Sequence, residues 1–216
     1  MVNILVHGLG QTEKSWDKII EELDKSNIKA ENPNLFELAK NYEINYENIY
    51  RTFCDYCNSF KEKINLCGLS LGGILSINYA IEYPEKVNSM ILIGTTYKIP
   101  KKIFKLQNFI FKFMPKSTFE NMGIKKNDFI NLTNSMADLD IKSKVDNIKC
   151  KVLILCGEKD NVNMESAKQL NRNIKASKLE IIKNAGHEVN TENPKELARV
   201  ISKYWKYKKR IGYISN

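Results

Sequence analysis

The sequence predicts an α/β fold in which helices cover both faces of a mostly parallel sheet. The chain opens with a short apolar run, NILVHGLG, that is typical of a buried strand ending in a glycine turn. Further runs of the same kind lie at 64–67, 87–94, 151–157 and 179–182. Stretches with apolar residues at helical spacing separate or follow them, at 15–27, 73–84, 164–173 and 194–207. Buried strands that alternate with helices are typical of a doubly wound sheet.

One segment, from Tyr97 to about Asp146, interrupts this alternation because it contains no strand pattern. Its stretch IFKLQNFIFKFM, residues 103–114, is apolar at eight of twelve positions, so such a helix must be covered by something. We expect a helical cap, residues 97–146, inserted into a core made of residues 1–96 and 147–216. A helix that lies on a membrane surface or binds a partner is the alternative.

Composition and charge exclude several classes of protein. No stretch reaches the roughly 20 apolar residues of a membrane-spanning helix, and the N-terminus lacks the pattern of a secretion signal, so a cytoplasmic location is expected. The formal net charge is +9, but the lysines are scattered and no nucleic-acid-binding module is present. The densest basic cluster, KYWKYKKR at 203–210, is interpreted as a solvated face of a terminal helix.

The five cysteines do not indicate a disulfide framework, because their number is odd and no export signal accompanies them. CDYC, residues 54–57, has the spacing of half a zinc site. A zinc site needs about four ligands, and the only histidines in the chain are His7 and His187. Cys54 and Cys57 are therefore interpreted as ordinary helix residues, and no metal site is predicted.

The sequence GLSLG, residues 68–72, matches the pattern G-x-S-x-G between a predicted strand and a predicted helix. A chain that turns sharply from strand to helix leaves no room for side chains two positions before and after the central residue. Gly68 and Gly72 meet that need, and the turn would expose the hydroxyl group of Ser70. A serine hydroxyl becomes a good nucleophile only when a base removes its proton, and the usual base is histidine. His7 and His187 are both candidates on this argument.

Five motifs in order resemble those of the α/β-hydrolase superfamily, and the chain is similar to its small serine esterase-like members. They are the early loop HGLGQTEKSW, the turn GLSLGG, the helix end and strand YPEKVNSMILIGTT, the strand VLILCGEKD and the loop NAGHEVN. The resemblance implies that Ser70 is the nucleophile, His187 the general base and Asp160 the acid that orients it. Glu158 is a weaker substitute for Asp160, and His7 has a structural role in the loop.

The same resemblance implies an oxyanion hole made by the backbone N–H groups of Leu9 and Leu71. It also implies that the first two strands of the usual eight are missing, which leaves about six. The state of the sheet edge and the oligomeric state stay open.

The expected activity is hydrolysis of a small carboxylic ester or thioester, with an apolar acyl or alkyl group, through an acyl-enzyme on Ser70. No cofactor is implied. Substrate contacts are predicted for Gln11, Trp16, Phe109 and Phe113. Two alternatives remain: a small-molecule receptor of the same fold that signals through its cap, and a lipase-like enzyme at a membrane surface, which is less favoured.

Overall fold

The computed structural model describes residues 1–97, 111, 113–120, 122–137 and 139–211, and for 207–211 the backbone alone. Its centre is a sheet of five strands in the order β1-β2-β3-β4-β5, and every neighbouring pair is parallel. The strands are β1 (Val2–Val6), β2 (Ile64–Leu69), β3 (Val87–Ile93), β4 (Lys151–Gly157) and β5 (Ser177–Ile182). All five carboxyl ends therefore lie at one edge of the sheet. The predicted fold class is confirmed.

The sheet has five strands among the described residues rather than the expected six or so. Beyond β1, pairing continues through a single parallel bridge between Ile4 and Glu31. The Glu31 N–H donates to the Asn3 carbonyl and the Leu5 N–H donates to the Glu31 carbonyl, both at 2.8 Å. Beyond β1, the sheet is thus extended by a single residue of extended chain.

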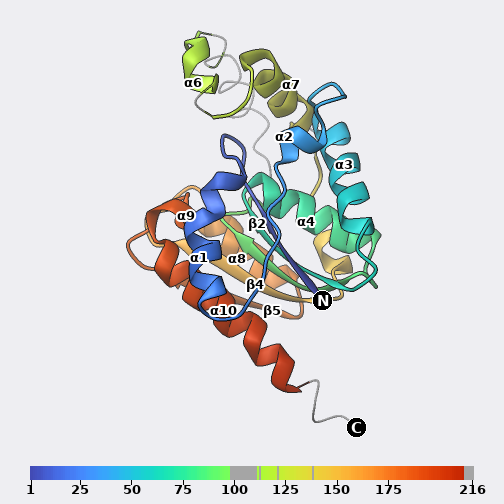
Figure 1. The fold of residues 1–216 in the computed structure, drawn as a ribbon, viewed down its shortest axis with the longest axis vertical. Coiled ribbons are helices and arrows are strands. Elements are labelled where there is room, and N and C mark those ends of the chain that lie inside the picture. The colour runs from blue at the N-terminus through green and yellow to red at the C-terminus, as the bar shows by residue number, and fades with distance from the viewer. Residues whose placement is uncertain (98–110, 112, 121, 138, 212–216) are drawn as a thin grey trace.

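Helices and short 3-10 turns connect and cover these strands (Figure 1). They are η1 (Glu13–Trp16), α1 (Asp17–Asp24), α2 (Leu35–Leu38), α3 (Tyr46–Asn58), α4 (Leu71–Glu82), α6 (Lys116–Glu120), α7 (Lys126–Met136), η2 (Val145–Asn147), α8 (Met164–Asn173), α9 (Val189–Glu192) and α10 (Pro194–Ile211). Asparagine side chains begin two of them. Asn34 accepts hydrogen bonds from the N–H groups of Phe36 and Glu37, and Asn45 accepts one from that of Asn48.

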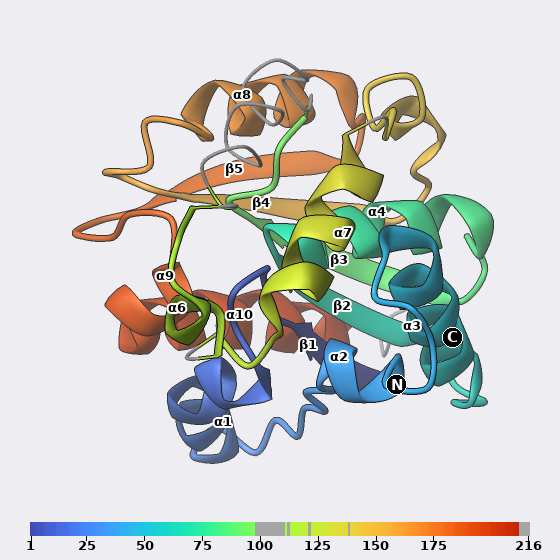
Figure 2. The ribbon, with the colours of Figure 1, turned by 90° about the horizontal axis from the view of Figure 1, so that it is seen from above.

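The two faces of the sheet bury two separate apolar cores because successive strand residues point in opposite directions. In β2, Leu66 packs on the side of α3, α4 and α8, whereas Cys67 and Leu69 pack on the side of α1 and α10. The view from above shows α1 and α10 on one side of the sheet and α4 and α8 on the other (Figure 2). Helices on both faces explain why the strands are continuous apolar runs.

Helices α6 and α7 lie in the connection between β3 and β4, beyond the carboxyl edge of the sheet (Figure 1). Phe119 and Phe129 pack together at a centroid distance of 5.1 Å, and Phe111 contacts both rings. Helix α7 packs against α3, and the Ser135 hydroxyl accepts a hydrogen bond from the Tyr46 N–H at 2.8 Å. This part of the chain is tied to the core by polar as well as apolar contacts.

The loop after β1 also touches this connection. A Cβ atom on Gly10 would lie 3.4 Å from the Met122 sulfur, and one on Gly123 would lie 2.6 Å from Cγ2 of Thr12. Both glycines have a positive φ, +80° and +71°. The turn at 122–123 therefore lies directly against residues 10–12.

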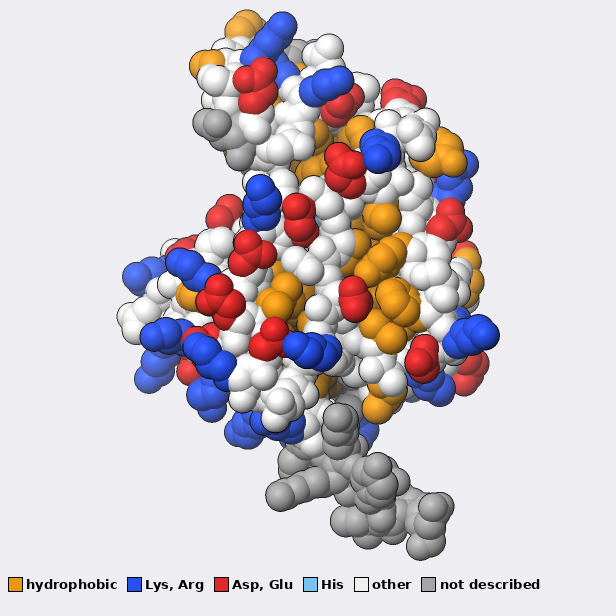
Figure 3. All heavy atoms as spheres, in the orientation of Figure 1, with side chains coloured by type: hydrophobic (Ala, Val, Ile, Leu, Met, Phe, Trp, Pro, Cys, Tyr) orange, Lys and Arg blue, Asp and Glu red, His pale blue; other side chains and the backbone are white. Residues whose placement is uncertain are grey.

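The molecular face in Figure 3 carries lysine and arginine side chains interspersed with aspartate and glutamate. On this face the positive net charge is not gathered into one basic patch. Within the described part of the chain, no helix combines the length and apolarity that crossing a membrane requires.

We expect the indole of Trp16 to contribute to stability through packing alone. The side chain is fully buried, and its Nε1 has no hydrogen-bond partner among the described residues. Trp16→Ala is expected to lower the free energy of unfolding by about 3–5 kcal/mol. Trp16→Phe should cost much less, because it also removes a buried N–H that is unpaired. Urea denaturation of both variants measures the difference, and equal losses would contradict this account.

Candidate active site

Ser70 stands at the junction of β2 and α4 in a strained conformation, with φ 52° and ψ −110°. A Cβ atom on Gly68 would lie 2.3 Å from the Gly72 carbonyl carbon, and one on Gly72 would lie 2.3 Å from the Val6 carbonyl oxygen. Neither position therefore tolerates a side chain without backbone movement. The predicted reason for these glycines is confirmed, since the backbones on either side of the turn are in direct contact.

The loop after β1 packs beside this turn. A Cβ on Gly8 would lie 2.7 Å from Cδ2 of Leu69 and 3.5 Å from Cβ of Ser70. The buried ring of His7 donates from Nδ1 to the Gly8 carbonyl oxygen at 2.9 Å, because its Nε2 accepts from the Leu35 N–H at 3.0 Å. Burial lowers the pKa of His7, which keeps the ring neutral. His7 is thus a structural residue.

This hydrogen bond also orients the peptide between Gly8 and Leu9. The Gly8 carbonyl oxygen accepts from His7 and from the Gln11 N–H, at 2.9 and 3.3 Å. In a planar trans peptide the N–H points opposite to the C=O. The Leu9 N–H is therefore directed away from His7. On the other side of the turn, Leu71 is the first residue of α4, and such an N–H has no partner within its helix.

Asp160 and His187 are brought together from the loops after β4 and β5. His187 Nδ1 and Asp160 Oδ2 are 2.9 Å apart. The carboxylate is 3% exposed and the imidazole 40%. One ring face is bounded by Gly94, because a Cβ there would lie 2.9 Å from His187 Nδ1 and 3.3 Å from Asp160 Oδ2. The glycine after β3 makes room for the pair.

Asn163 supports this pair. Its N–H donates to Asp160 Oδ1 at 3.1 Å, and its Nδ2 lies 3.0 Å from each carboxylate oxygen. Nδ2 is also 3.1 Å from His187 Nδ1. Because the pKa of Asp160 is lowered, its ionised carboxylate can only accept, so the proton between His187 and Asp160 belongs on Nδ1 of the imidazole. Nε2 of neutral His187 is then left with its lone pair free.

Electrostatics reinforce the pair. Burial opposes ionisation of Asp160, but hydrogen bonds from His187 and Asn163, with the positive charge of His187, together hold its pKa below the usual value. The hydrogen bond to Asp160 raises the pKa of His187 above 6.5 against the effect of burial, and the charges of Asp160, Glu188 and Glu192 raise it further. The pair therefore favours the charged imidazole more than water does.

The end of β3 connects Ser70 to the His187–Asp160 pair. The Ser70 N–H donates to the Ile93 carbonyl at 2.9 Å, and the following residue, Gly94, is the one that contacts His187 and Asp160. No hydrogen bond joins the Ser70 hydroxyl to His187 among the described residues. In enzymes without substrate such bonds are often long and shorten only in the complex.

The other predicted residues lie in different places. The Glu158 carboxylate accepts a hydrogen bond from the Asn184 N–H at 3.1 Å, so it supports the loop before His187 instead of contacting the ring. Gln11 and Asn190 form a reciprocal amide pair at 3.2 and 3.1 Å, and a substrate contact for Gln11 stays a prediction.

The prediction that Trp16 contacts substrate is wrong, because this side chain is fully buried in the core beside α10. Phe113 is 75% exposed, and its contact with substrate stays a prediction. Phe109 lies outside the described residues.

The sequence reasoning missed Asn163 and Glu192. Asn163 follows Asp160 by three positions, a spacing at which an asparagine can return to cap the loop that precedes a helix. The Glu192 carboxylate accepts from the Gly186 N–H at 2.7 Å and from the Glu188 N–H at 3.1 Å. The signal for Glu192 was an acidic residue in the turn that follows the histidine loop.

No group of three or more potential metal ligands comes together among the residues described. Cys54 and Cys57 both lie buried in α3, where burial raises the pKa of each thiol and that of Cys54 to about 11.

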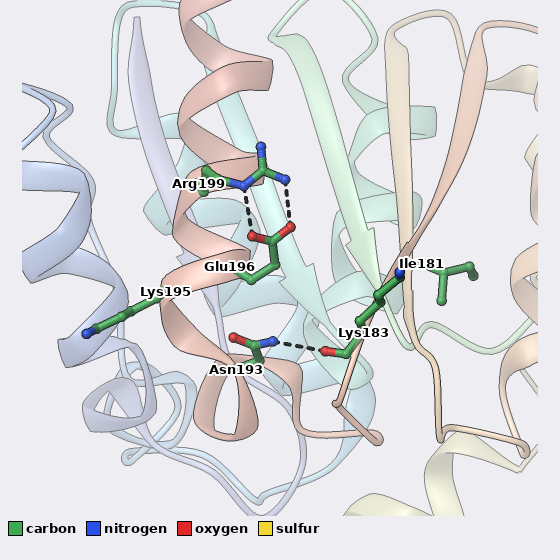
Figure 4. A pocket seen from close by; sticks show the side chains of 6 residues that line it. All are labelled: Ile181, Lys183, Asn193, Lys195, Glu196 and Arg199. Carbon is green, nitrogen blue, oxygen red and sulfur yellow. Dashed lines mark hydrogen bonds and ion pairs between the residues drawn. The ribbon is translucent and has the colours of Figure 1, made fainter.

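A surface groove elsewhere on the molecule does not reach the site. It is lined by Ile181, Lys183, Asn193, Lys195, Glu196 and Arg199 (Figure 4). In this groove, the Arg199 guanidinium donates hydrogen bonds of 2.8 and 2.6 Å to the Glu196 carboxylate, which neutralises its charge. Neither the strained serine nor the His–Asp pair lines it.

Comparison with known proteins agrees with this fold. The family model described as "Serine aminopeptidase, S33" matches residues 50–140, which include Ser70. A curated relative from Bacillus subtilis, "Putative 2-succinyl-6-hydroxy-2,4-cyclohexadiene-1-carboxylate synthase", is 25% identical over 93% of this chain and 89% of its own length. The chain spans 34% to 62% of the length of three further relatives that it matches.

Solved structures share the fold over nearly the whole chain. An esterase from Exiguobacterium antarcticum superposes with a TM-score of 0.80 at 17% identity, covering 95% of this chain and 92% of its own. MenH from S. aureus superposes with a TM-score of 0.75 at 17% identity, covering 97% and 94%. The chain is an enzyme of the hydrolase type. It belongs to the α/β-hydrolase superfamily.

We expect Asp160 rather than Glu158 to set the protonation of His187. Asp160→Asn should lower the pKa of His187, because it removes the negative charge and leaves only a neutral acceptor for the Nδ1–H group. Glu158→Gln should leave this pKa nearly unchanged, because Glu158 contacts Asn184. An NMR titration of the imidazole protons measures both variants. A larger decrease in Glu158→Gln would contradict the assignment.

Proposed function

We propose that the chain is a serine hydrolase that cleaves a small carboxylic ester or thioester through an acyl-enzyme on Ser70. The observation that carries the proposal is the position of the His187–Asp160 pair, whose atoms are 2.9 Å apart. The pair borders Gly94, and the residue before Gly94, Ile93, has the carbonyl that accepts from the Ser70 N–H. Nucleophile, base and orienting acid thus come from the ends of three different strands.

The chemistry needs two proton transfers in each half-reaction. His187 Nε2 takes the hydroxyl proton of Ser70 as Oγ attacks the carbonyl carbon, and the imidazolium returns that proton to the leaving alkoxide or thiolate. Water then loses a proton to His187 and attacks the acyl-enzyme, and the same proton returns to Ser70 Oγ as the acid departs. Asp160 stabilises the imidazolium in both halves.

The N–H groups of Leu9 and Leu71 are proposed to bind the oxyanion of each tetrahedral intermediate. The orientation of the Gly8–Leu9 peptide by His7 supports the first donor. The N–H at the start of α4, which has no partner within its helix, and the positive end of that helix support the second. Removing one such donor from an oxyanion hole typically costs about 100- to 1,000-fold in rate.

The names of similar proteins favour ester chemistry without fixing the substrate. Esterases are among the structures that share the fold. The name of the B. subtilis relative indicates a product that carries carboxylates. Cations suit such groups, whereas α4, which begins at the nucleophile, contains no lysine or arginine. We therefore favour a substrate with an apolar acyl or alkyl group.

A fluorophosphonate probe tests the nucleophile. It should modify Ser70, as mapped by mass spectrometry of peptides, and Ser70→Ala should abolish labelling and lower hydrolysis of p-nitrophenyl esters at least about 1,000-fold. Ser59→Ala, which changes an exposed serine, is the control. Labelling elsewhere would contradict the proposal. Labelling of Ser70 without turnover in a panel of esters graded by acyl length would favour the receptor alternative.

The activity should fall at acid pH because only neutral His187 can accept the serine proton. The pKa of His187 is raised, so protonation begins at a higher pH than for a free imidazole. We therefore expect the acid limb of kcat/KM to have an apparent pKa above 6.5. Initial rates between pH 5 and 9 at constant ionic strength measure it, and a limb well below 6.5 would contradict the assignment of His187 as base.

A further inference from the structure

The loop that carries His187 is held from outside by a carboxylate that takes no part in the proposed chemistry. Glu192 ends the single turn of α9, and its side chain reaches back toward the start of that turn. Oε2 accepts from the Gly186 N–H at 2.7 Å, and Oε1 accepts from the Glu188 N–H at 3.1 Å. These are the residues immediately before and after His187, so one carboxylate binds the backbone on both sides of the imidazole.

The opposite side of this loop is packed against β4. A Cβ on Gly157 would lie 2.0 Å from the Gly186 carbonyl oxygen, and one on Gly186 would lie 3.1 Å from Glu192 Oε1. The Ala185 carbonyl accepts from the Lys159 N–H at 2.8 Å, next to Asp160. The loop is therefore confined between the strand that leads to Asp160 and the Glu192 carboxylate.

Two acidic residues near His187 differ in how they are bonded. Glu188 and Glu192 are both exposed, and the charge of each raises the pKa of His187. The Glu188 carboxylate accepts only from the Thr191 hydroxyl, at 3.3 Å, among the described residues. Glu192 bonds the loop backbone, whereas Glu188 does not. Variants of the two residues can therefore distinguish the effect of a nearby charge on the pKa of His187 from the effect of holding the loop in place.

We propose that Glu192 is a positioning residue, which fixes the His187 imidazole against Asp160 and toward Ser70 by binding the N–H groups on both sides of it. The inference rests on the proposed function of His187 as the base. It goes beyond that function because the Glu192 carboxylate binds the backbone of the loop and has no step in the proposed reaction. A carboxylate is suited to this task because its two oxygens can accept two N–H groups at once.

The test compares Glu192→Gln and Glu192→Asp with the control Glu188→Gln, using p-nitrophenyl butyrate. An amide oxygen replaces only one of the two acceptors, and the aspartate keeps the charge but is one methylene too short. Both changes at Glu192 should lower kcat roughly 10-fold or more on the alkaline plateau, with KM nearly unchanged. Glu188→Gln should keep kcat within about twofold.

The acid limb separates charge from position. Glu192→Gln and Glu188→Gln each remove a charge that raises the pKa of His187, so both should move the limb to lower pH. Glu192→Asp should leave the limb nearly in place while kcat falls. Wild-type kcat in both Glu192 variants would overturn the inference, and so would an equal loss in Glu188→Gln.

An NMR measurement distinguishes failure of this inference from failure of the proposed function. The chain has only two histidines, so the signal of His187 is read beside that of the buried His7, which reports whether the variant is folded. In folded Glu192 variants the Nδ1–H proton bound to Asp160 should exchange with water faster than in the wild type. Unchanged exchange would overturn the inference even if no ester were hydrolysed.

Discussion

The contact between backbones beneath Ser70 is the constraint on which the rest of the site depends. The end of β1, the turn after β2 and the first turn of α4 meet without side chains between them, because Gly68 and Gly72 have none. This contact brings the Gly8–Leu9 peptide beside Ser70. It also makes the start of α4 face the carboxyl edge of the sheet. The strain at Ser70 is maintained by packing that any bulkier residue at these glycines would break.

A second set of contacts gives the histidine loop its shape, and it is polar rather than apolar. Asn163, Glu158 and Glu192 each satisfy groups in the loops after β4 and β5. Irregular loops leave backbone N–H groups without partners in a helix or sheet, and these side chains supply them. Polar residues beside the His–Asp pair therefore serve the geometry of the loops first, and the charge of Glu192 also raises the pKa of His187.

The sequence was sufficient to predict the strands, the glycine turn and the pairing of Asp160 with His187. Apolar runs and the G-x-S-x-G spacing are local signals, and the order of the motifs predicted that Asp160 and His187 pair, which the structure shows. The edge beyond β1 could not be predicted, because a single bridge at Glu31 leaves no periodic pattern. Trp16 was misassigned because a large aromatic near the site has the same appearance in sequence whether it contacts substrate or fills the core. Glu192 was missed because its role depends on which backbone groups its carboxylate reaches.

The place of α6 and α7 in the chain affects which parts of the sequence can change during evolution without altering the order of Ser70, Asp160 and His187. They enter and leave the core between β3 and β4, whereas Ser70 follows β2, and Asp160 and His187 follow β4 and β5. Mutations, insertions or exchange of that connection leave the order of these three residues in the chain intact. Such changes must keep the contacts of Met122 and Gly123 with residues 10–12, where the connection packs against the loop after β1. Selection on the sequence of this connection can therefore act separately from selection on Ser70, Asp160 and His187.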